Sequence, residues 1–194
     1  RDLSLSDELF ARKMEMLASC DESMDIIVLP EYSDVPCATA TLEETLFWHD
    51  TFIGPLLSAC AETAKRCGAI VFVNARSYEE SADGRNTTYA FDRSGRIAGK
   101  YFKQHLTPGE VTKMRLDSEY TYEHSEPTVV EIEGLRFAFL TCYDFYFYEA
   151  FGNIARQNVD IVIGCSHQRS DTHLALEIFS QNLAYNTNAY VIRS

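Results

Sequence analysis

The chain has 194 residues, of which 46% are hydrophobic, and a formal net charge of −12 at pH 7. This length and composition suffice for one sizeable core, so we expect a single domain over residues 1–194. The negative charge repels phosphate backbones, which argues against a nucleic-acid partner. The sequence contains no apolar run long enough to cross a bilayer and opens without a signal pattern. We therefore expect a cytoplasmic protein with no membrane partner.

Six cysteines are scattered at irregular intervals, and no two of them form a CxxC pair. A zinc knuckle needs such pairs, so the sequence predicts no metal site of that kind. In a chain of this size, irregular spacing favours reduced thiols over a disulfide framework.

The first half of the chain alternates amphipathic helices with apolar strands. Ser6 is suited to cap the first helix, and Gly68 is suited to end the second. A continuous apolar run stopped by Pro30 is typical of a strand buried on both faces. In chain order, the predicted elements are a helix over residues 6–22, a strand over 25–29, a helix over 46–67, and strands over 69–74, 87–92 and 96–103.

The second half begins with a long polar connection over residues 104–126, and connections of this length are often functional. The elements predicted after it are strands over 128–132 and 135–141, a helix over 146–157, a strand over 159–163, a helix over 171–186 and a strand over 189–193. This alternation predicts an α/β layered fold with a mixed sheet. Because the chain opens on a helix and closes on a strand, we expect a domain that is incomplete at both ends.

Three polar residues stand where apolar strands end. Glu31 follows the first strand, Lys103 closes the strand before the long connection, and Cys142 closes the strand over residues 135–141. Ligands of open α/β sheets bind outside the carboxyl ends of the strands, so the three side chains are expected to converge on one pocket. A helix is predicted soon after Cys142, and a helix N-terminus would favour the nucleophilic thiolate.

Three segments carry a resemblance to a known family: Leu29-Pro30-Glu31, the run from Tyr101 to Leu106 around Lys103, and Cys142-Tyr143-Asp144. In order and approximate spacing they resemble the glutamate, lysine and cysteine motifs of the nitrilase superfamily, also called carbon–nitrogen hydrolases. The resemblance implies a four-layer α-β-β-α sandwich with mixed sheets that lacks its first strand and its C-terminal strands. It also implies subunits paired across a helical face, and hence a homodimer or a higher homo-oligomer.

The resemblance further implies an activity, the hydrolysis of a non-peptide carbon–nitrogen bond in a small amide, N-carbamoyl compound or nitrile. Cys142 would attack the substrate carbon and form a thioester. Glu31 would serve as general base and acid. Lys103 and the backbone N–H of Tyr143 would stabilise the oxyanion. This chemistry requires no metal or organic cofactor.

Family members place a second glutamate near the lysine and the cysteine, and two candidates exist. Glu119 is preferred because its distance before Cys142 suits the family pattern, and Glu110 is the alternative. Tyr143 and Phe147 are candidates to line the substrate pocket. Arg169 is a further candidate, since a guanidinium can pair with a substrate carboxylate through two parallel hydrogen bonds.

Three other functions are compatible with the sequence. A papain-like hydrolase would pair Cys142 with one of five histidines, none of which has a recognisable local motif. A non-catalytic binding or assembly module of the same fold would not need Glu31, Lys103 and Cys142 together. An amide-forming acyltransferase would keep all three and pass the acyl group to an amine in place of water.

Overall fold

The computed structural model describes residues 5–36, 41–121, 128–168 and 171–194, and within them eight strands form two four-stranded sheets. The strands of the first sheet, in spatial order, are β1 (Ile26–Val28), β2 (Ile70–Ser77), β3 (Arg85–Phe91) and β4 (Ile97–Phe102). Those of the second are β5 (Val130–Ile132), β6 (Leu135–Thr141), β7 (Ile161–Cys165) and β8 (Tyr190–Arg193). Each sheet combines parallel and antiparallel pairs, which confirms the predicted mixed sheets.

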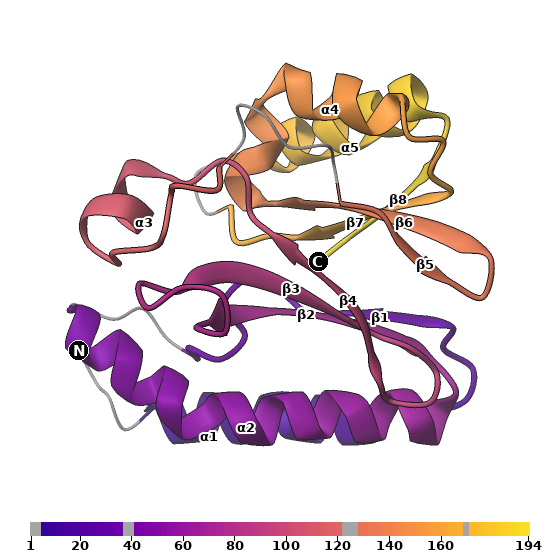
Figure 1. The fold of residues 1–194 in the computed structure, drawn as a ribbon. Helices are drawn as coiled ribbons and strands as arrows, with labels where there is room; N and C mark the ends of the chain where they lie inside the picture. Colours follow the sequence, from indigo (N-terminus) through magenta and orange to yellow (C-terminus); the bar gives the residue numbers. More distant parts are fainter. Residues whose placement is uncertain (1–4, 37–40, 122–127, 169–170) are drawn as a thin grey trace.

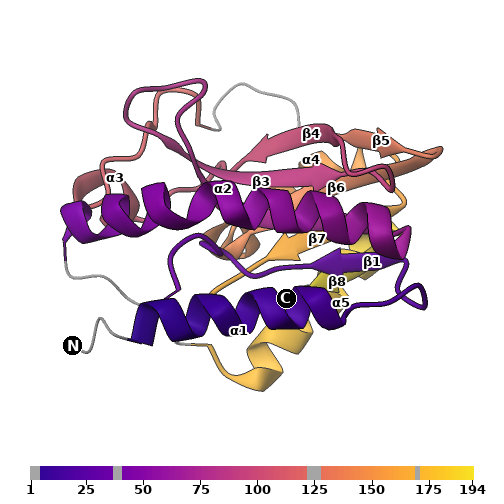
Figure 2. The same ribbon diagram turned by 90° about the horizontal axis from the view of Figure 1, so that it is seen from below.

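The helices cover the outer faces of the two sheets (Figure 1). Seen from below, α1 (Leu5–Ser19) and α2 (Leu42–Cys67) lie side by side across the first sheet (Figure 2). On the opposite side, α4 (Tyr148–Ala155) and α5 (His173–Thr187) cover the second sheet. The result is the four-layer α-β-β-α sandwich that the resemblance implies.

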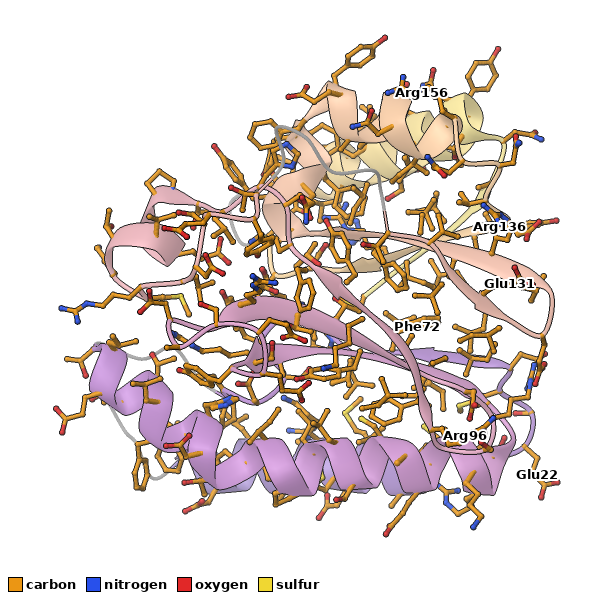
Figure 3. The ribbon with its side chains drawn as sticks, viewed as in Figure 1. Glu22, Phe72, Arg96, Glu131, Arg136 and Arg156 are labelled. Atoms are coloured by element: carbon orange, nitrogen blue, oxygen red, sulfur yellow. The ribbon has the colours of Figure 1, made fainter. Side chains whose placement is uncertain are left out.

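The apolar layer between the two sheets is built mainly from aromatic and branched side chains. Phe72 of β2 points into this layer (Figure 3), and its ring centroid lies 5.2 Å from that of Phe137 and 5.8 Å from that of Phe139. Because these rings come from different sheets, their contact holds β2 and β6 face to face.

Most predicted elements are present with shifted boundaries. The second helix begins at Leu42, where the Thr41 hydroxyl accepts a hydrogen bond from the Glu44 N–H, and it ends at Gly68 with φ of 63°. The long polar connection contains a short helix that is not predicted from the sequence, α3 (Pro108–Thr112). The helix predicted from residue 146 starts at Tyr148, and a five-residue 3-10 helix, η1 (Cys142–Tyr146), precedes it.

The strand directions bring the functional ends together. β4 runs parallel to β1, because β1 pairs parallel with β2 and two antiparallel pairings follow. The carboxyl ends of β1 and β4 therefore lie at the same edge of the first sheet. Figure 1 shows α3 at this end of the sandwich and the β5–β6 hairpin at the opposite end.

None of the helices in the described ranges combines the length and the apolar character needed to cross a bilayer.

Candidate active site

Lys103 is the centre of a buried charge cluster at the carboxyl end of β4. Its side chain is 1% exposed, and its ammonium donates to Glu31 Oε1 at 2.8 Å. It also donates to both carboxylate oxygens of Glu110, each at 2.9 Å. An ammonium carries three N–H donors, so these three contacts use all of them.

Glu110 is placed by a capping box at the start of α3. The Thr107 hydroxyl accepts from the Glu110 N–H at 3.2 Å, and Glu110 Oε2 accepts from the Thr107 N–H at 2.8 Å. Pro108 follows the cap, where its fixed φ suits the first turn. This local geometry turns the Glu110 carboxylate toward Lys103.

Three further polar groups complete the cluster. The Tyr32 hydroxyl donates to Glu110 Oε1 at 2.7 Å. The side-chain amide of Asn86 donates to Glu31 Oε1 and to Glu110 Oε1, each at 3.0 Å. A second amide, that of Asn74, donates to Asn86 Oδ1 at 2.7 Å. Every charge in this buried cluster therefore has hydrogen-bonding partners, as burial requires.

Cys142 occupies a strained elbow directly after β6. Its φ of 47° lies in the left-handed region, which residues with a Cβ seldom adopt. The buried Asp144 holds the elbow, because it accepts from the Thr141 N–H at 2.8 Å and from the Tyr101 hydroxyl at 2.7 Å. Asp144 also accepts from the His105 N–H at 2.8 Å. Strain of this kind is characteristic of functional positions in folded proteins.

The carboxylates differ in their protonation energetics. Burial raises the pKa of Glu31, and the attraction of Lys103 only partly opposes this. Burial would also raise the pKa of Glu110, but Lys103, Tyr32 and the Thr107 N–H hold it below its ordinary value. Glu110 is therefore the firmly ionised partner of Lys103, and Glu31 is the carboxylate better suited to take up a proton.

The Cys142 thiol lies close enough to the Glu31 carboxyl group for each to influence the pKa of the other. Burial raises the pKa of this thiol to about 12, and the Glu31 carboxylate acts in the same direction. Lys103 and the backbone N–H of His167 oppose the shift. The prediction of a thiolate stabilised by a helix dipole is wrong, because η1 is a single short 3-10 segment and burial favours the neutral thiol.

A cavity of about 550 Å³ opens onto these groups. Glu31, Lys103, Glu110 and Cys142 all line it. Its remaining wall includes the first turn of α2 and the segment around α3. The predicted convergence of the three strand-end side chains therefore occurs at the surface of a chamber large enough for a small molecule.

The other predicted site residues lie in different places. Glu119 is exposed, and its backbone N–H donates to Asp117. The structure thus brings Glu110, and not Glu119, to Lys103. Tyr143 and Phe147 pack edge to face with ring centroids 5.0 Å apart, and neither is among the described residues that line the cavity. Arg169 lies outside the described residues.

From the sequence, Glu110 is only the alternative to Glu119, and Asn86 is not predicted to belong to the site. Thr107-Pro108-Gly109-Glu110 has the spacing of a capping box with proline at the first helical position, which predicts an ordered Glu110. Asn86-Thr87-Thr88 matches a glycosylation sequon, a pattern that does not predict a buried amide in the site. It is fully buried in β3, where its amide serves the two carboxylates.

No group of three or more His, Cys, Asp or Glu side chains suited to hold a metal ion occurs among the described residues. The five cysteines that the structure describes are free thiols.

Comparison with known proteins places the chain in a family. The family model described as carbon–nitrogen hydrolase matches residues 5–194. The chain is 30% identical over 127 residues to 2-oxoglutaramate amidase of Bacillus subtilis, a match that covers 64% of the chain and 45% of that relative, less than half of its length.

Solved structures of similar fold include an amidase from Nesterenkonia sp., with a TM-score of 0.72 and 16% identity over 97% of this chain and 69% of that one. They also include a nitrilase-superfamily member from Saccharomyces cerevisiae, with a TM-score of 0.70 and 18% identity over 96% of this chain and 68% of that one. With the family model matching nearly every residue, the chain belongs to the carbon–nitrogen hydrolase family.

Proposed function

We propose that the protein hydrolyses a carbon–nitrogen bond of a small amide through a thioester on Cys142. The observation that supports this proposal is that Cys142, Glu31 and Lys103 line one cavity, with Lys103 donating to Glu31 at 2.8 Å. A nucleophile beside a candidate base and a buried cation is the constellation that acyl transfer requires.

In the first step, Glu31 takes the thiol proton while the sulfur attacks the amide carbon. Burial raises the pKa of the thiol to about 12, so it is protonated at neutral pH and Glu31 is the group proposed to remove its proton. The carbon–sulfur bond forms, the carbonyl oxygen becomes an oxyanion, and Glu31 becomes neutral.

Neutralisation of Glu31 changes the hydrogen bonds of Lys103. Its ammonium donates one N–H to Glu31 Oε1 at 2.8 Å. Once Glu31 carries the proton, that contact weakens and the N–H can turn toward the oxyanion. The backbone N–H of Tyr143 is the proposed second donor. Glu110 stays ionised and keeps Lys103 charged throughout.

Glu31 then gives its proton to the leaving nitrogen, and ammonia or an amine departs from the thioester. A water molecule enters, Glu31 removes one of its protons, and the hydroxide attacks the acyl carbon. The acid product leaves as Cys142 recovers its proton, so each turnover consumes one amide and one water. The alternative acyltransferase would admit an amine at the step where water enters.

The test is turnover by the full-length protein with a panel of small amides, N-carbamoyl compounds and nitriles. The panel includes 2-oxoglutaramate, the compound named for the Bacillus subtilis relative. Ammonia release and the intact mass of the protein are followed together. Cys142→Ala should abolish turnover and adduct formation, whereas the matched change Cys20→Ala should leave both unchanged.

An adduct on a cysteine other than Cys142 would refute the nucleophile. A loss of all turnover in His167→Ala, with Glu31→Gln fully active, would favour the papain-like alternative. An added amine acceptor that is converted to an amide faster than water is consumed would favour acyl transfer. A protein that binds panel compounds and turns none of them over would favour the non-catalytic module.

We further propose that two copies pair through the outer face of α5. Leu174, Ile178 and Tyr185 lie on this helix and are 65%, 51% and 89% exposed. Exposed apolar side chains gathered on one helix are typical of an interface. Ile178→Glu should turn a dimer into a monomer in light scattering, whereas Met16→Glu on α1 should not. A monomeric parent protein would refute the pairing.

A further inference from the structure

Asn86 is the one neutral side chain in the described cluster that touches both carboxylates. Its Nδ2 atom donates to Glu31 Oε1 and to Glu110 Oε1, each at 3.0 Å. The side chain is 0% exposed and is not part of the cavity wall. It therefore acts on the acids from behind, away from the space that a substrate would enter.

The orientation of this amide is fixed by a second one. Asn74 Nδ2 donates to Asn86 Oδ1 at 2.7 Å and to the Thr88 hydroxyl at 3.1 Å. Asn74 Oδ1 accepts from the Tyr32 N–H at 2.9 Å. With the Asn74 oxygen committed to the backbone, its amide nitrogen must face Asn86, and the Asn86 nitrogen must face the carboxylates.

The same pair links the acids to the backbone beside Glu31. Tyr32 follows Glu31 directly and has φ of 53°, in the left-handed region. Its N–H is held by Asn74, and its hydroxyl is held by Glu110. The strained turn that presents Glu31 is thus fastened at both its backbone and its side chain.

We infer that Asn86, oriented by Asn74, is a positioning residue that keeps Glu31 ionised and aimed at the Cys142 thiol. This rests on the proposed function and extends it, because Asn86 touches neither the thiol nor the cavity. Two carboxylates this close repel each other and favour protonation of one of them. An N–H group that donates to both carboxylates stabilises their charged forms, so Glu31 can stay ionised.

The experiment measures the rate of Cys142 alkylation by iodoacetamide against pH, by mass spectrometry of the peptide that contains it. In the parent protein the rate should fall at acid pH as Glu31 becomes protonated, and Glu31→Gln should abolish that acid limb. Asn86→Asp replaces the shared donor by a third carboxyl group. It should move the limb upward by about one pH unit or more, the shift expected when a hydrogen bond to a charged group is lost.

Two variants separate positioning from mere structural support. Asn74→Asp touches neither acid, yet by reversing the contact with Asn86 it should move the limb in the same direction by a smaller amount. Asn86→Ala removes both donations without adding charge and gives the same upward shift if Asn86→Asp does not fold. The control is Asn158→Asp, at an exposed asparagine remote from the site, which should leave the limb unchanged.

The outcomes are distinguishable. A Glu31-dependent limb that none of these Asn86 and Asn74 variants moves, whatever their melting temperatures, overturns the inference and leaves the proposed hydrolysis standing. If the limb shifts as expected but the protein hydrolyses none of the panel compounds, the inference is supported and the proposed hydrolysis is refuted. A parent protein without a Glu31-dependent limb overturns both.

Discussion

Replacing Glu110 by glutamine tests whether this residue, and not Glu119, is the second carboxylate of the site. Four groups donate to Glu110, namely Lys103, Tyr32, Asn86 and the Thr107 N–H. Lys103 and Thr107 both reach Oε2, at 2.9 and 2.8 Å. In the Glu110→Gln variant this position becomes an N–H₂ group, so two donors lose their acceptor and Lys103 loses one counter-charge.

The size of the effect follows from these contacts. Breaking a buried ion pair costs about 3–5 kcal/mol, and the surviving contact of Lys103 with Glu31 places this case near the low end, at about 3 kcal/mol. For a protein of this size that corresponds to a fall in melting temperature of roughly 6–12 °C. Since Lys103 would then turn toward Glu31 and away from the oxyanion, kcat should fall by about 10²-fold.

Urea unfolding and turnover measure the two effects, and Glu119→Gln is the matched control. Because Glu119 is exposed, its change should alter stability by less than about 0.5 kcal/mol. The pKa of Glu110 is lowered, so its stabilisation is complete above the unfolded value of about 4.3 and is lost as pH falls through the lowered pKa. The variant should therefore lose less stability than the parent below about pH 4. Equal, small effects of the two changes would refute the reasoning.

Two further predictions follow from buried groups. Asp144→Asn should lower the free energy of unfolding by about 2–3 kcal/mol and reduce kcat, because the carboxylate that holds the Cys142 elbow is replaced by an amide with only one acceptor oxygen. Unchanged turnover would show that the elbow does not depend on the Asp144 carboxylate. Burial raises the pKa of Cys60 and of Cys165 to about 12, so each is protonated when folded and ionises near pH 8.5 when unfolded. Their contribution to stability is complete below pH 8.5 and is lost as pH rises toward 12, at up to about 1.4 kcal/mol per pH unit for each thiol. In urea titrations from pH 8 to 11, Cys60→Ala should decline less steeply than the parent; a parallel decline would contradict the assignment.

The positions of Glu31, Lys103 and Cys142 could be predicted because each follows an apolar strand, and strand ends of an α/β fold converge. The identity of the second glutamate could not be predicted from distance along the chain. It depends on a capping box of four residues that turns Glu110 inward, whereas Glu119 lies nine residues further on at the surface.

The protonation state of Cys142 also could not be predicted from the sequence. The pattern showed a strand followed by a helix, from which a dipole-stabilised thiolate is a reasonable inference. The structure places a short 3-10 segment there, and the local dielectric, set by side chains distant in sequence, governs the proton instead. Burial of a single sulfur depends on the packing of both sheets, which no local pattern encodes.

The proposed catalytic groups come from opposite halves of the sandwich. Glu31 and Lys103 follow strands of the first sheet, and Cys142 follows a strand of the second. The distance between the Glu31 carboxyl group and the Cys142 sulfur therefore depends on how the two sheets are positioned against each other. The packed rings of Phe72, Phe137 and Phe139, which lie between the sheets, fix this relative position. The packing of the apolar core therefore sets the distance between the proposed catalytic groups. A small shift of one sheet against the other would slow the proposed reaction, although each residue of the site would keep its neighbours within its own sheet.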